Sequence, residues 1–267
     1  MFWVNGVKQD MISLTDRSFQ YGDGCFTTLM TEEGKPLLWM MHQERIEACL
    51  NVLGIEHPDW SLLLQWIEQA ALPSGKAGVK VHISRGEGGR GYSPTQVGPS
   101  NVTISTFALP EQYSAWRKEG VKLGVSQVKL GLNPILAGHK HNNRLEQVLA
   151  KADIEKQSLV DGIVLDINGN VIESTIANIF WVIGDTLYTP DLTLSGVAGV
   201  ARRSVLEVAE KTSQAVEVGQ YRLEALMKAD EVFICNSLMG IVPVTRIADQ
   251  EFKIGPLTKR YQEKVNT

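Results

Sequence analysis

The sequence predicts an α+β protein that is rich in β-hairpins. Turn-forming pairs interrupt apolar runs at 5–6 (Asn-Gly), 168–169 (Asn-Gly) and 184–185 (Gly-Asp). Asn-Gly tolerates the positive φ angles that tight hairpins need. Apolar residues also recur at helical spacing, for example over 40–53. Because strands and helices do not alternate regularly along the chain, a doubly wound βαβ fold is excluded.

The composition limits the class of protein. The chain has 267 residues, of which 43% are hydrophobic, enough to bury the core of one large domain or two closely associated ones. The net charge is −4 and the basic residues are scattered, which argues against nucleic acid as a partner. No apolar run is long enough to span a membrane, and the opening Met-Phe-Trp-Val-Asn-Gly lacks the pattern of a signal peptide. We therefore expect a cytoplasmic protein.

Three cysteines, Cys25, Cys49 and Cys235, form no Cys-x-x-Cys pair. Their odd number argues against a disulfide framework, and the absence of a pair argues against a structural zinc site. The sequence therefore predicts no metal site.

The N-terminal part is predicted to contain short strands and two helices. A strand at 2–4 enters the first hairpin, helices cover 40–53 and 61–72, and 79–83 alternates like a half-buried strand. Residues 21–29 combine two glycines with an aromatic residue and two threonines. That segment is either a loop entering a strand close to a ligand or an ordinary turn.

Arg45 lies on or next to the apolar face of the helix expected at 40–53. A guanidinium in such a place either forms a buried ion pair or clamps an anion, since its fork of donors suits phosphate and carboxylate. The sequence alone leaves both interpretations open.

The run at 84–92 contains four glycines. Its spacing is not Gly-x-Gly-x-x-Gly ahead of a helix, and no Gly-Lys-Ser/Thr follows, so we reject a nucleotide site. The loop presents Arg85, Arg90 and Tyr92, which suit an acidic small molecule. A disordered surface hairpin is the alternative.

The rest of the chain continues the mixture of strands and helices. Strands are expected at 101–109, 120–128, 162–167, 170–172, 187–190, 232–235 and 241–244, and helices from near 140, from 200 and over 223–229.

Lys140 is the candidate nucleophile. Glycines and a proline break regular structure before it, and the apolar residues after it recur at helical spacing and are expected to pack on a core: Leu145, Val148, Leu149 and Ala152. Lys140 would then stand at the mouth of a helix. A lysine attacks an aldehyde only as the neutral amine, which desolvation or neighbouring cations favour. The alternative is that it merely solvates the start of the helix.

Two features of the C-terminal half suit an anionic, nitrogen-containing ligand. Glu173 leaves a buried strand, and a carboxylate there needs a partner. The glycine-rich turn at 196–199 feeds a helix, whose N-terminal N–H groups and positive dipole end bind phosphate.

Pyridoxal 5'-phosphate fits these features together. Its aldehyde would take Lys140, and its phosphate would take the helix N-terminus and Arg45. Glu173 would keep the pyridine nitrogen protonated, so that the ring accepts electrons.

The sequence also resembles the fold-type IV pyridoxal-phosphate enzymes over nearly its whole length. By that resemblance Lys140 bonds the cofactor, Glu173 is the partner of the pyridine nitrogen, and Leu187 packs against the ring. The resemblance implies that the phosphate is held by Arg45, the backbone of Val200 and Ala201, and the hydroxyl of Ser237.

Within this group, the segments at 21–28, 83–92 and 140–149 are most similar to those of the aminodeoxychorismate lyases. The resemblance implies removal of pyruvate from 4-amino-4-deoxychorismate, which gives 4-aminobenzoate for folate biosynthesis. The implied catalytic residues are Lys140, Thr27 and Thr28, and the candidates for binding substrate are Arg90, Arg85, Phe26 and Tyr92.

Two positions depart from related transaminases. Leu145 stands where branched-chain transaminases have a tyrosine near the ring hydroxyl of the cofactor, so the partner of that hydroxyl is not identified. Thr27 stands where D-amino acid transaminases carry a glutamate, which argues against that activity.

The resemblance implies a two-domain α+β fold with a small N-terminal domain at 1–110 and a larger barrel-like domain at 111–267. The cofactor would lie between them. Relatives complete their sites across a subunit interface, so we expect a homodimer. Two alternatives stay open: an aminotransferase of D- or branched-chain amino acids that uses the same cofactor, and a non-catalytic anion-binding protein in which Lys140 and Glu173 form an ion pair.

Overall fold

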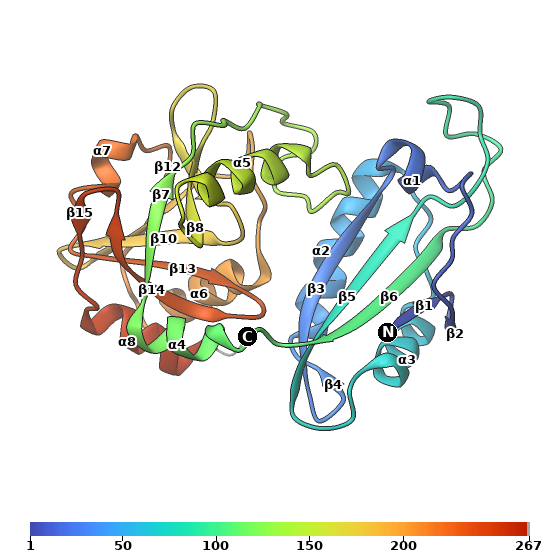
Figure 1. Cartoon of the computed structure of the whole chain (residues 1–267), viewed down its shortest axis with the longest axis horizontal. Coiled ribbons are helices and arrows are strands. Elements are labelled where there is room, and N and C mark those ends of the chain that lie inside the picture. Colours follow the sequence, from blue (N-terminus) through green and yellow to red (C-terminus); the bar gives the residue numbers. More distant parts are fainter. Residues whose placement is uncertain (266–267) are drawn as a thin grey trace. The chain divides into compact units, whose positions relative to one another are not determined.

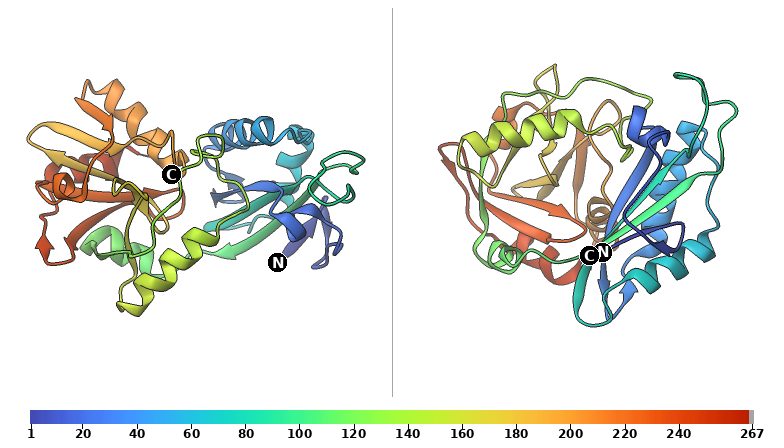
Figure 2. Two further views of the ribbon diagram at one scale, coloured as in Figure 1. Left: turned by 90° about the horizontal axis from the view of Figure 1, so that it is seen from above. Right: turned by 45° about the vertical axis from the view of Figure 1, so that its right-hand side comes forward.

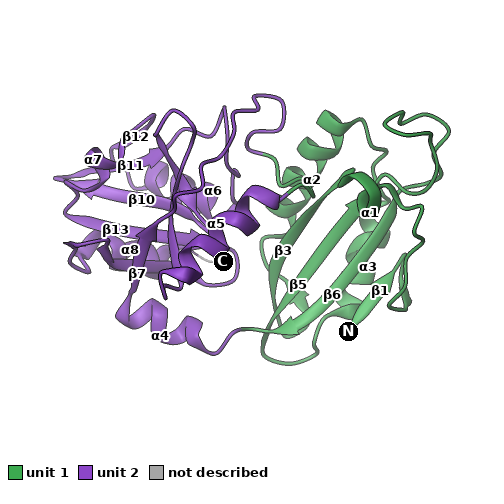
Figure 3. Cartoon of the chain, turned by 45° about the horizontal axis from the view of Figure 1, so that its top comes forward, with its two compact units in different colours: residues 1–109, 139–143 green, residues 110–138, 144–267 purple. Residues whose placement is uncertain are grey.

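A computed structural model of the chain describes residues 1–265 (Figure 1). The chain forms two compact units, coloured separately in Figure 3. Unit 1 comprises Met1–Leu109 and His139–Asn143, and unit 2 comprises Pro110–Gly138 and Arg144–Thr267. The short segment that holds Lys140 therefore belongs to unit 1, although the sequence on both sides of it belongs to unit 2.

Unit 1 contains a six-stranded antiparallel sheet in the order β2-β1-β6-β5-β3-β4. Its strands are β1 (Phe2–Val4), β2 (Val7–Lys8), β3 (Gly24–Glu32), β4 (Lys35–Pro36), β5 (Lys76–Ser84) and β6 (Asn101–Ala108). The predicted first hairpin is confirmed, because Asn5 and Gly6 both have positive φ angles, 48° and 78°.

Helices α2 (Trp39–Leu53) and α3 (Trp60–Ala70) cover one face of this sheet (Figure 2). Alternate residues of the central strands point into the core beneath them. The buried side chains from the sheet are Cys25, Leu29, Val79, Val81, Ile83, Val102 and Ile104, and they pack against Ile46, Cys49, Leu50, Leu63 and Ile67 of the helices. The short helix α1 (Arg17–Tyr21) precedes β3 and begins at Asp16, whose side chain accepts a hydrogen bond from the N–H of Ser18.

Unit 2 is built on a nine-stranded sheet in the order β12-β11-β10-β13-β14-β7-β8-β9, with β15 paired to β14. Its strands are β7 (Val121–Val125), β8 (Asp161–Leu165), β9 (Val171–Ser174), β10 (Asn178–Ile183), β11 (Thr186–Pro190), β12 (Val216–Gly219), β13 (Glu231–Asn236), β14 (Gly240–Ile247) and β15 (Gln250–Glu251). A tight turn, in which Ser174 N donates to Ala177 O over 2.8 Å, joins the end strand β9 directly to β10. The sheet must therefore curl, which gives unit 2 the barrel-like form that the resemblance implies.

The helices of unit 2 are α4 (Gln112–Glu119), α5 (Leu145–Lys156), α6 (Val200–Lys211), α7 (Leu223–Leu226) and α8 (Pro256–Lys264). Helices α6 and α8 pack on β10 and β13 through a core that includes Val205, Tyr261, Phe180 and Phe233. None of the helices within residues 1–265 is long and apolar enough to cross a membrane.

The prediction for the helix after Lys140 was wrong in two respects. The helix begins at Leu145, not near 140, and all four residues of the expected apolar stripe are exposed. Leu145, Val148 and Leu149 are 70%, 60% and 51% exposed. The buried residues of α5 are Ala150 and Ile154 instead.

The packing of α5 has a simple steric cause. A Cβ atom at Gly162 would lie 2.1 Å from Cδ1 of Ile154, and one at Gly124 would lie 3.0 Å from the same atom. Only glycine leaves room for the Ile154 side chain at these two positions, which lie on β7 and β8. The helix therefore packs on these strands through the face that carries Ala150 and Ile154.

Candidate active site

Lys140 lies on an extended segment that pairs with the edge of β3. The N–H of Phe26 donates to the carbonyl oxygen of Lys140 over 3.0 Å, and the N–H of Asn142 donates to Gly24 O over 2.9 Å. The side chain of Asn142 also donates to Ser18 Oγ over 2.8 Å. These bonds, and not a helix N-terminus, fix the backbone of the candidate nucleophile.

The ammonium group of Lys140 lies over the ring of Phe26, 4.7 Å from its centroid. The ammonium group of Lys80, on β5, lies 4.6 Å from the same centroid. An aromatic face attracts a cation and also removes water from one side of it. Phe26 therefore contacts both lysines, and the sequence-predicted pair Lys140 and Phe26 is brought together.

The two candidate catalytic threonines lie on opposite faces of β3, because neighbouring residues of a strand alternate. Thr27 is fully buried on the face covered by α2, and its hydroxyl lies 2.7 Å from Nδ1 of His42. Nη2 of Arg45 donates to the same hydroxyl. Thr28 is half-buried on the other face, opposite Lys80.

The Thr27 hydroxyl has two hydrogen-bond partners in the core, His42 and Arg45. Burial, aided by the charge of Arg45, holds the pKa of His42 well below its usual 6.5, so the imidazole is neutral at pH 7. A guanidinium only donates, so the Thr27 hydroxyl accepts from Arg45, and it also forms a hydrogen bond with Nδ1 of His42. The Thr27 side chain is thus part of the core. The Thr28 side chain lies on the opposite face of β3, which also carries Phe26.

Arg85 is held by main-chain and carboxylate groups. Its Nε donates to Asp23 Oδ2 over 2.7 Å, Nη1 donates to Gly54 O over 2.8 Å, and Nη2 donates to Leu53 O over 2.6 Å. Every nitrogen of the guanidinium is used inside the protein. This geometry favours a structural role for Arg85 over the predicted contact with substrate.

Arg17 is a buried residue of the site region that the sequence did not reveal. It is 3% exposed, and its Nε donates to the same Asp23 Oδ2 over 2.8 Å. Its Nη1 donates to the carbonyl oxygens of Gly91 and Gly88, over 3.1 and 3.3 Å. Arg17 therefore ties Asp23 to the glycine-rich loop, and no local pattern marks such a tertiary contact.

Asp23 stays ionised between these two cations. Burial by itself raises the pKa of its carboxyl, but the hydrogen bonds and charges of Arg85 and Arg17 outweigh burial and bring the pKa below its usual 3.8.

The other two candidates on the glycine-rich loop are exposed. Arg90 lies at the loop tip, and Tyr92 is 89% exposed with its ring edge-on to Tyr21, 5.6 Å between centroids. The tip holds Gly89 and Gly91 at positive φ angles of 73° and 57°, which a side chain would disfavour. The loop thus has a defined backbone that presents Arg90 to solvent.

In unit 2, Glu173 is buried at the end of β9. Its Oε2 accepts a hydrogen bond from the N–H of Val197 over 3.0 Å. The turn after it is fixed by Asp161, whose Oδ1 accepts from both the N–H and the hydroxyl of Thr175, over 3.0 and 2.6 Å. The carboxylate is therefore held in a defined position, as a partner for a ring nitrogen requires.

The predicted anion site begins at Gly199, the N-cap residue of α6, which carries no side-chain cap. Asn178 fixes the turn before the helix: its Oδ1 accepts from Gly199 N over 3.1 Å, and its Nδ2 donates to Val197 O over 2.8 Å. One buried amide thus links the strand after Glu173 to the N-terminal end of α6. The N–H groups of Val200 and Ala201 follow in the first turn, where anions bind.

Ser237 is a predicted member of the anion site, and Arg202 lies in the first turn of α6. Ser237 is half-buried in the turn between β13 and β14, which Asn236 ties to Ile176 O over 3.2 Å. Arg202 is partly buried, and burial lowers its pKa below the usual 12.5. Its Nη2 donates to Pro190 O over 3.0 Å, whereas its buried Nε has no hydrogen-bond partner within residues 1–265. An uncapped helix end beside such a donor fits a phosphate group.

Leu187 is the residue that the sequence predicts to pack against the cofactor ring. Its side chain is fully buried in the core with Phe180, Ala201 and Phe233. The apolar residue that adjoins the Glu173 carboxylate is Val197, through its N–H. The predicted contact of Leu187 with a cofactor ring stays a prediction.

Similarity to known proteins extends over the chain. A family model described as Amino-transferase class IV matches residues 24–247. Aminodeoxychorismate lyase of Vibrio harveyi is 52% identical over 271 residues and covers 100% of both chains. Aminodeoxychorismate lyase of Bacillus subtilis (strain 168) is 32% identical over 261 residues, covering 94% of this chain and 88% of the relative. The crystal structure of 4-amino-4-deoxychorismate lyase from Pseudomonas aeruginosa matches with a TM-score of 0.92 at 35% identity, covering 98% and 97% of the two chains.

Proposed function

Because the chain belongs to the class IV amino-transferase family, we propose that it is an aminodeoxychorismate lyase that depends on pyridoxal phosphate. The proposed reaction removes pyruvate from 4-amino-4-deoxychorismate and leaves 4-aminobenzoate, for folate biosynthesis. The observation that carries the proposal is the 52% identity to the V. harveyi lyase over the full length of both chains. Family membership also confirms the predicted α+β fold of the fold-type IV enzymes.

Pyridoxal phosphate, when bound, supplies a ring that stabilises the negative charge left by removal of a proton next to nitrogen. We assign Lys140 as the residue that bonds the cofactor aldehyde and Glu173 as the group that holds the proton on the ring nitrogen. The buried, fixed position of Glu173 supports that role. For the phosphate we assign the N–H groups of Val200 and Ala201, together with Arg45 and Ser237.

Two residues of unit 1 are proposed to move protons. Lys140 takes the ring proton next to the substrate nitrogen, since it carries the reactive amine and Phe26 shields that amine from water on one side. Thr28 is proposed to deliver a proton to the departing enolpyruvyl oxygen. We prefer it to Thr27, whose hydroxyl is fully buried and hydrogen-bonded to His42 and Arg45 in the core.

We assign recognition of the substrate carboxylate to Arg90. Phe26 and Tyr92 are proposed as aromatic side chains that contact the substrate. Arg90 is exposed on a loop whose backbone is tied down by Arg17, so its guanidinium is available to a carboxylate. Arg85 is given a structural role, as described above.

We also propose a homodimer. The exposed stripe of Leu145, Val148 and Leu149 on α5 supports it, because solvent-facing aliphatic side chains clustered on one helix often mark a protein interface. A sedimentation experiment on the holoenzyme should give twice the mass of one chain, and a monomer at full activity would contradict the proposal.

A cytoplasmic location is part of the same proposal. Cys25, Cys49 and Cys235 are all buried as thiols, a state that a reducing compartment maintains.

The direct test supplies purified holoenzyme with 4-amino-4-deoxychorismate and measures both products. Equal amounts of pyruvate and 4-aminobenzoate should form without any keto acid. If the amino group is instead transferred to an added keto acid and no 4-aminobenzoate forms, the protein is an aminotransferase.

A further inference from the structure

We propose that Lys80 binds a carboxylate of the substrate, in a pocket on the face of the unit 1 sheet opposite α2 and α3. The inference rests on the proposed function, since it assigns a second recognition group to the same reaction. Its support comes from the pocket, from the pattern of residues across three strands and from the charges around Lys80.

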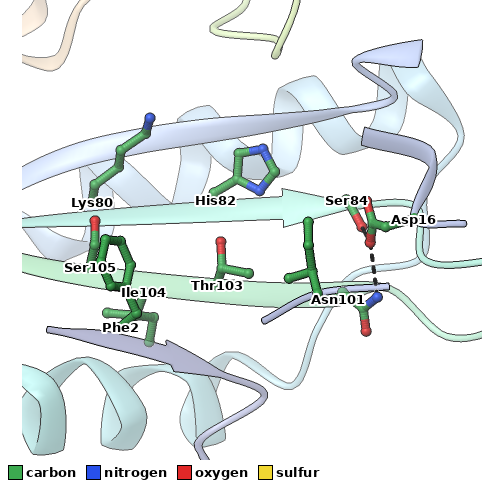
Figure 4. Close-up of a pocket in the computed structure, with 10 residues that line it drawn as sticks. Phe2, Asp16, Lys80, His82, Ser84, Asn101, Thr103, Ile104 and Ser105 are labelled. Carbon is green, nitrogen blue, oxygen red and sulfur yellow. Dashed lines mark hydrogen bonds between the residues drawn. The ribbon is translucent and has the colours of Figure 1, made fainter. Parts of the chain in front are cut away.

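The pocket has a volume of about 220 Å³ and lies over β5 and β6 (Figure 4). Its polar lining consists of Asp16, Lys80, His82, Ser84, Asn101, Thr103 and Ser105. The apolar part of the wall consists of the exposed residues Phe2 and Ile12 and the buried residue Ile104. A pocket that combines an apolar wall with a few polar groups suits a small organic acid.

Strand register explains why these side chains share one face. Thr28 of β3 pairs with Lys80 of β5, which pairs with Ser105 of β6. Residues that pair directly across an antiparallel sheet point to the same side of it. The Lys80 ammonium therefore rises from the same face as the hydroxyls of Thr28 and Ser105, and Figure 4 shows Lys80 with Ser105 beside it.

Phe26 belongs to a second row of paired residues on the same face of the sheet. Phe26 of β3 pairs with His82, and His82 pairs with Thr103. The residues of this row lie two positions along each strand from those of the Lys80 row, so the side chains of both rows point to the same face of the sheet. Phe26, the residue that contacts Lys140, thus adjoins the Lys80 side chain from a neighbouring row.

The charges make Lys80 an anion-binding group. Lys80 forms no salt bridge within residues 1–265, although its ammonium is ordered over the ring of Phe26. The one carboxylate of the pocket, Asp16, already accepts from Ser18 N, Ser84 Oγ and Asn101 Nδ2, over 2.8, 2.6 and 2.9 Å. A ligand carboxylate would therefore meet a cation that has no anionic partner.

His82 contributes no second positive charge at pH 7. Burial, followed by the charge of Lys80, lowers its pKa from 6.5 to about 4, against a smaller opposing effect of Asp16. The hydroxyls of Thr103 and Ser105 form no hydrogen bond within residues 1–265, so both can donate to an anion held by Lys80.

The distance between the ammonium groups of Lys80 and Lys140 suits the proposed substrate. The ammonium groups of Lys140 and Lys80 lie 4.7 and 4.6 Å from one centroid, so they are separated by at most about twice that distance. The substrate is a ring with an amine at one end and a carboxylate at the opposite end. With its amine end at Lys140 and its ring along Phe26, its carboxylate would reach toward Lys80.

The test measures binding of 4-aminobenzoate, the proposed product, to holoenzyme by equilibrium titration, with aniline as the matched ligand that lacks the carboxylate. In Lys80→Met the Kd for 4-aminobenzoate should rise by roughly 10- to 100-fold, the effect of one lost charge-assisted hydrogen bond. The Kd for aniline should stay unchanged. Lys80→Arg should keep most of the affinity because it keeps the charge.

The control variant is Lys76→Met on the same strand, where the ammonium pairs at the surface with Glu32 over 3.6 Å. It should bind both ligands like the wild type. An unchanged Kd for 4-aminobenzoate in Lys80→Met overturns the inference, and so does an equal loss for aniline, which would indicate altered packing. Failure of the wild type to release pyruvate would instead reject the proposed function, so the two failures are distinguished.

Discussion

The buried guanidinium of Arg17 donates its Nε hydrogen to Oδ2 of Asp23 over 2.8 Å, and Arg85 donates to the same oxygen over 2.7 Å. One carboxylate thus joins α1 to the start of the glycine-rich loop. Because Arg17 also donates to the carbonyl groups of Gly88 and Gly91, the position of the loop tip depends on a buried side chain of α1.

Arg17→Met should therefore act on recognition and stability, and not on the cofactor. The KM for the substrate should rise while the visible absorbance of bound cofactor is retained. The free energy of unfolding should fall by about 1.5–3 kcal/mol, the worth of hydrogen bonds made by a charged group. Lys35→Met, which removes a surface pair with Glu68, is the control and should change stability by less than about 1 kcal/mol. An unchanged KM in Arg17→Met would refute the positioning role.

Arg90→Ala tests the loop tip itself. Loss of one charge-assisted hydrogen bond to a carboxylate should lower kcat/KM by roughly 10- to 150-fold. The spectrum of the bound cofactor should stay as in the wild type, since Arg90 lies on the exposed loop. Steady-state kinetics that match the wild type would show that the loop is not a carboxylate site.

Glu173→Gln keeps the size of the side chain and an oxygen that can accept from Val197 N–H. It removes the negative charge that holds the proton on the ring nitrogen. The kcat should fall by at least about 10²-fold, because preorganised charge stabilisation of that size is lost, while cofactor remains bound through the phosphate site. Glu173→Ala would also empty a buried position, so the isosteric variant is the informative one. Full turnover in Glu173→Gln would remove Glu173 from the proposed chemistry.

The buried histidines predict a pH dependence of stability. His82 has a folded pKa of about 4 against 6.5 in the unfolded chain, so the unfolded state binds more protons between these values. The free energy of unfolding is therefore highest above pH 6.5, where the imidazole is neutral in both states, and it falls as the pH drops toward 4. The pKa of His42 is also lowered in the folded state, so protonation of His42 reduces the free energy of unfolding over the same direction of pH. Urea unfolding at pH 7.5 and pH 5 should show the lower free energy of unfolding at pH 5. The difference between the two pH values should be smaller in His82→Gln. An identical difference in that variant would contradict the lowered pKa of His82.

Most of the fold could be predicted because its signals are local. The Asn-Gly and Gly-Asp turns, the helices at 40–53 and 61–72 and the alternating strands depend on nearby residues, and the structure confirms them to within a few positions. The start of α5 could not be predicted in this way. Residues 139–143 are drawn into an extended form by β3, more than 100 positions away in the sequence.

Long-range contacts also explain what the sequence missed at the site. The apolar stripe of α5 looks like a core face, but Gly124 and Gly162 select the face of Ala150 and Ile154 instead. Arg85 looks available until Asp23, Leu53 and Gly54 are seen to occupy its donors. The contacts of Arg17 and Asn178 depend on partners that only the folded chain places beside them.

Lys140→Ala should abolish nearly all turnover, because the group that bonds the cofactor and the group that takes the proton are the same amine. Some cofactor should still bind through the phosphate site in unit 2. Equilibrium dialysis against pyridoxal phosphate measures the retained binding. Retention of full lyase activity would show that Lys140 is not the reactive lysine.

Reduction of the holoenzyme with borohydride, followed by mass analysis of its peptides, tests the central assignment most directly, because two lysine amines lie at the ring of Phe26. We predict that the visible absorbance is lost and that the cofactor is fixed stoichiometrically to the peptide that contains Lys140. The peptide that contains Lys80 should remain unmodified. Label on Lys80, or on any lysine other than Lys140, would contradict the account.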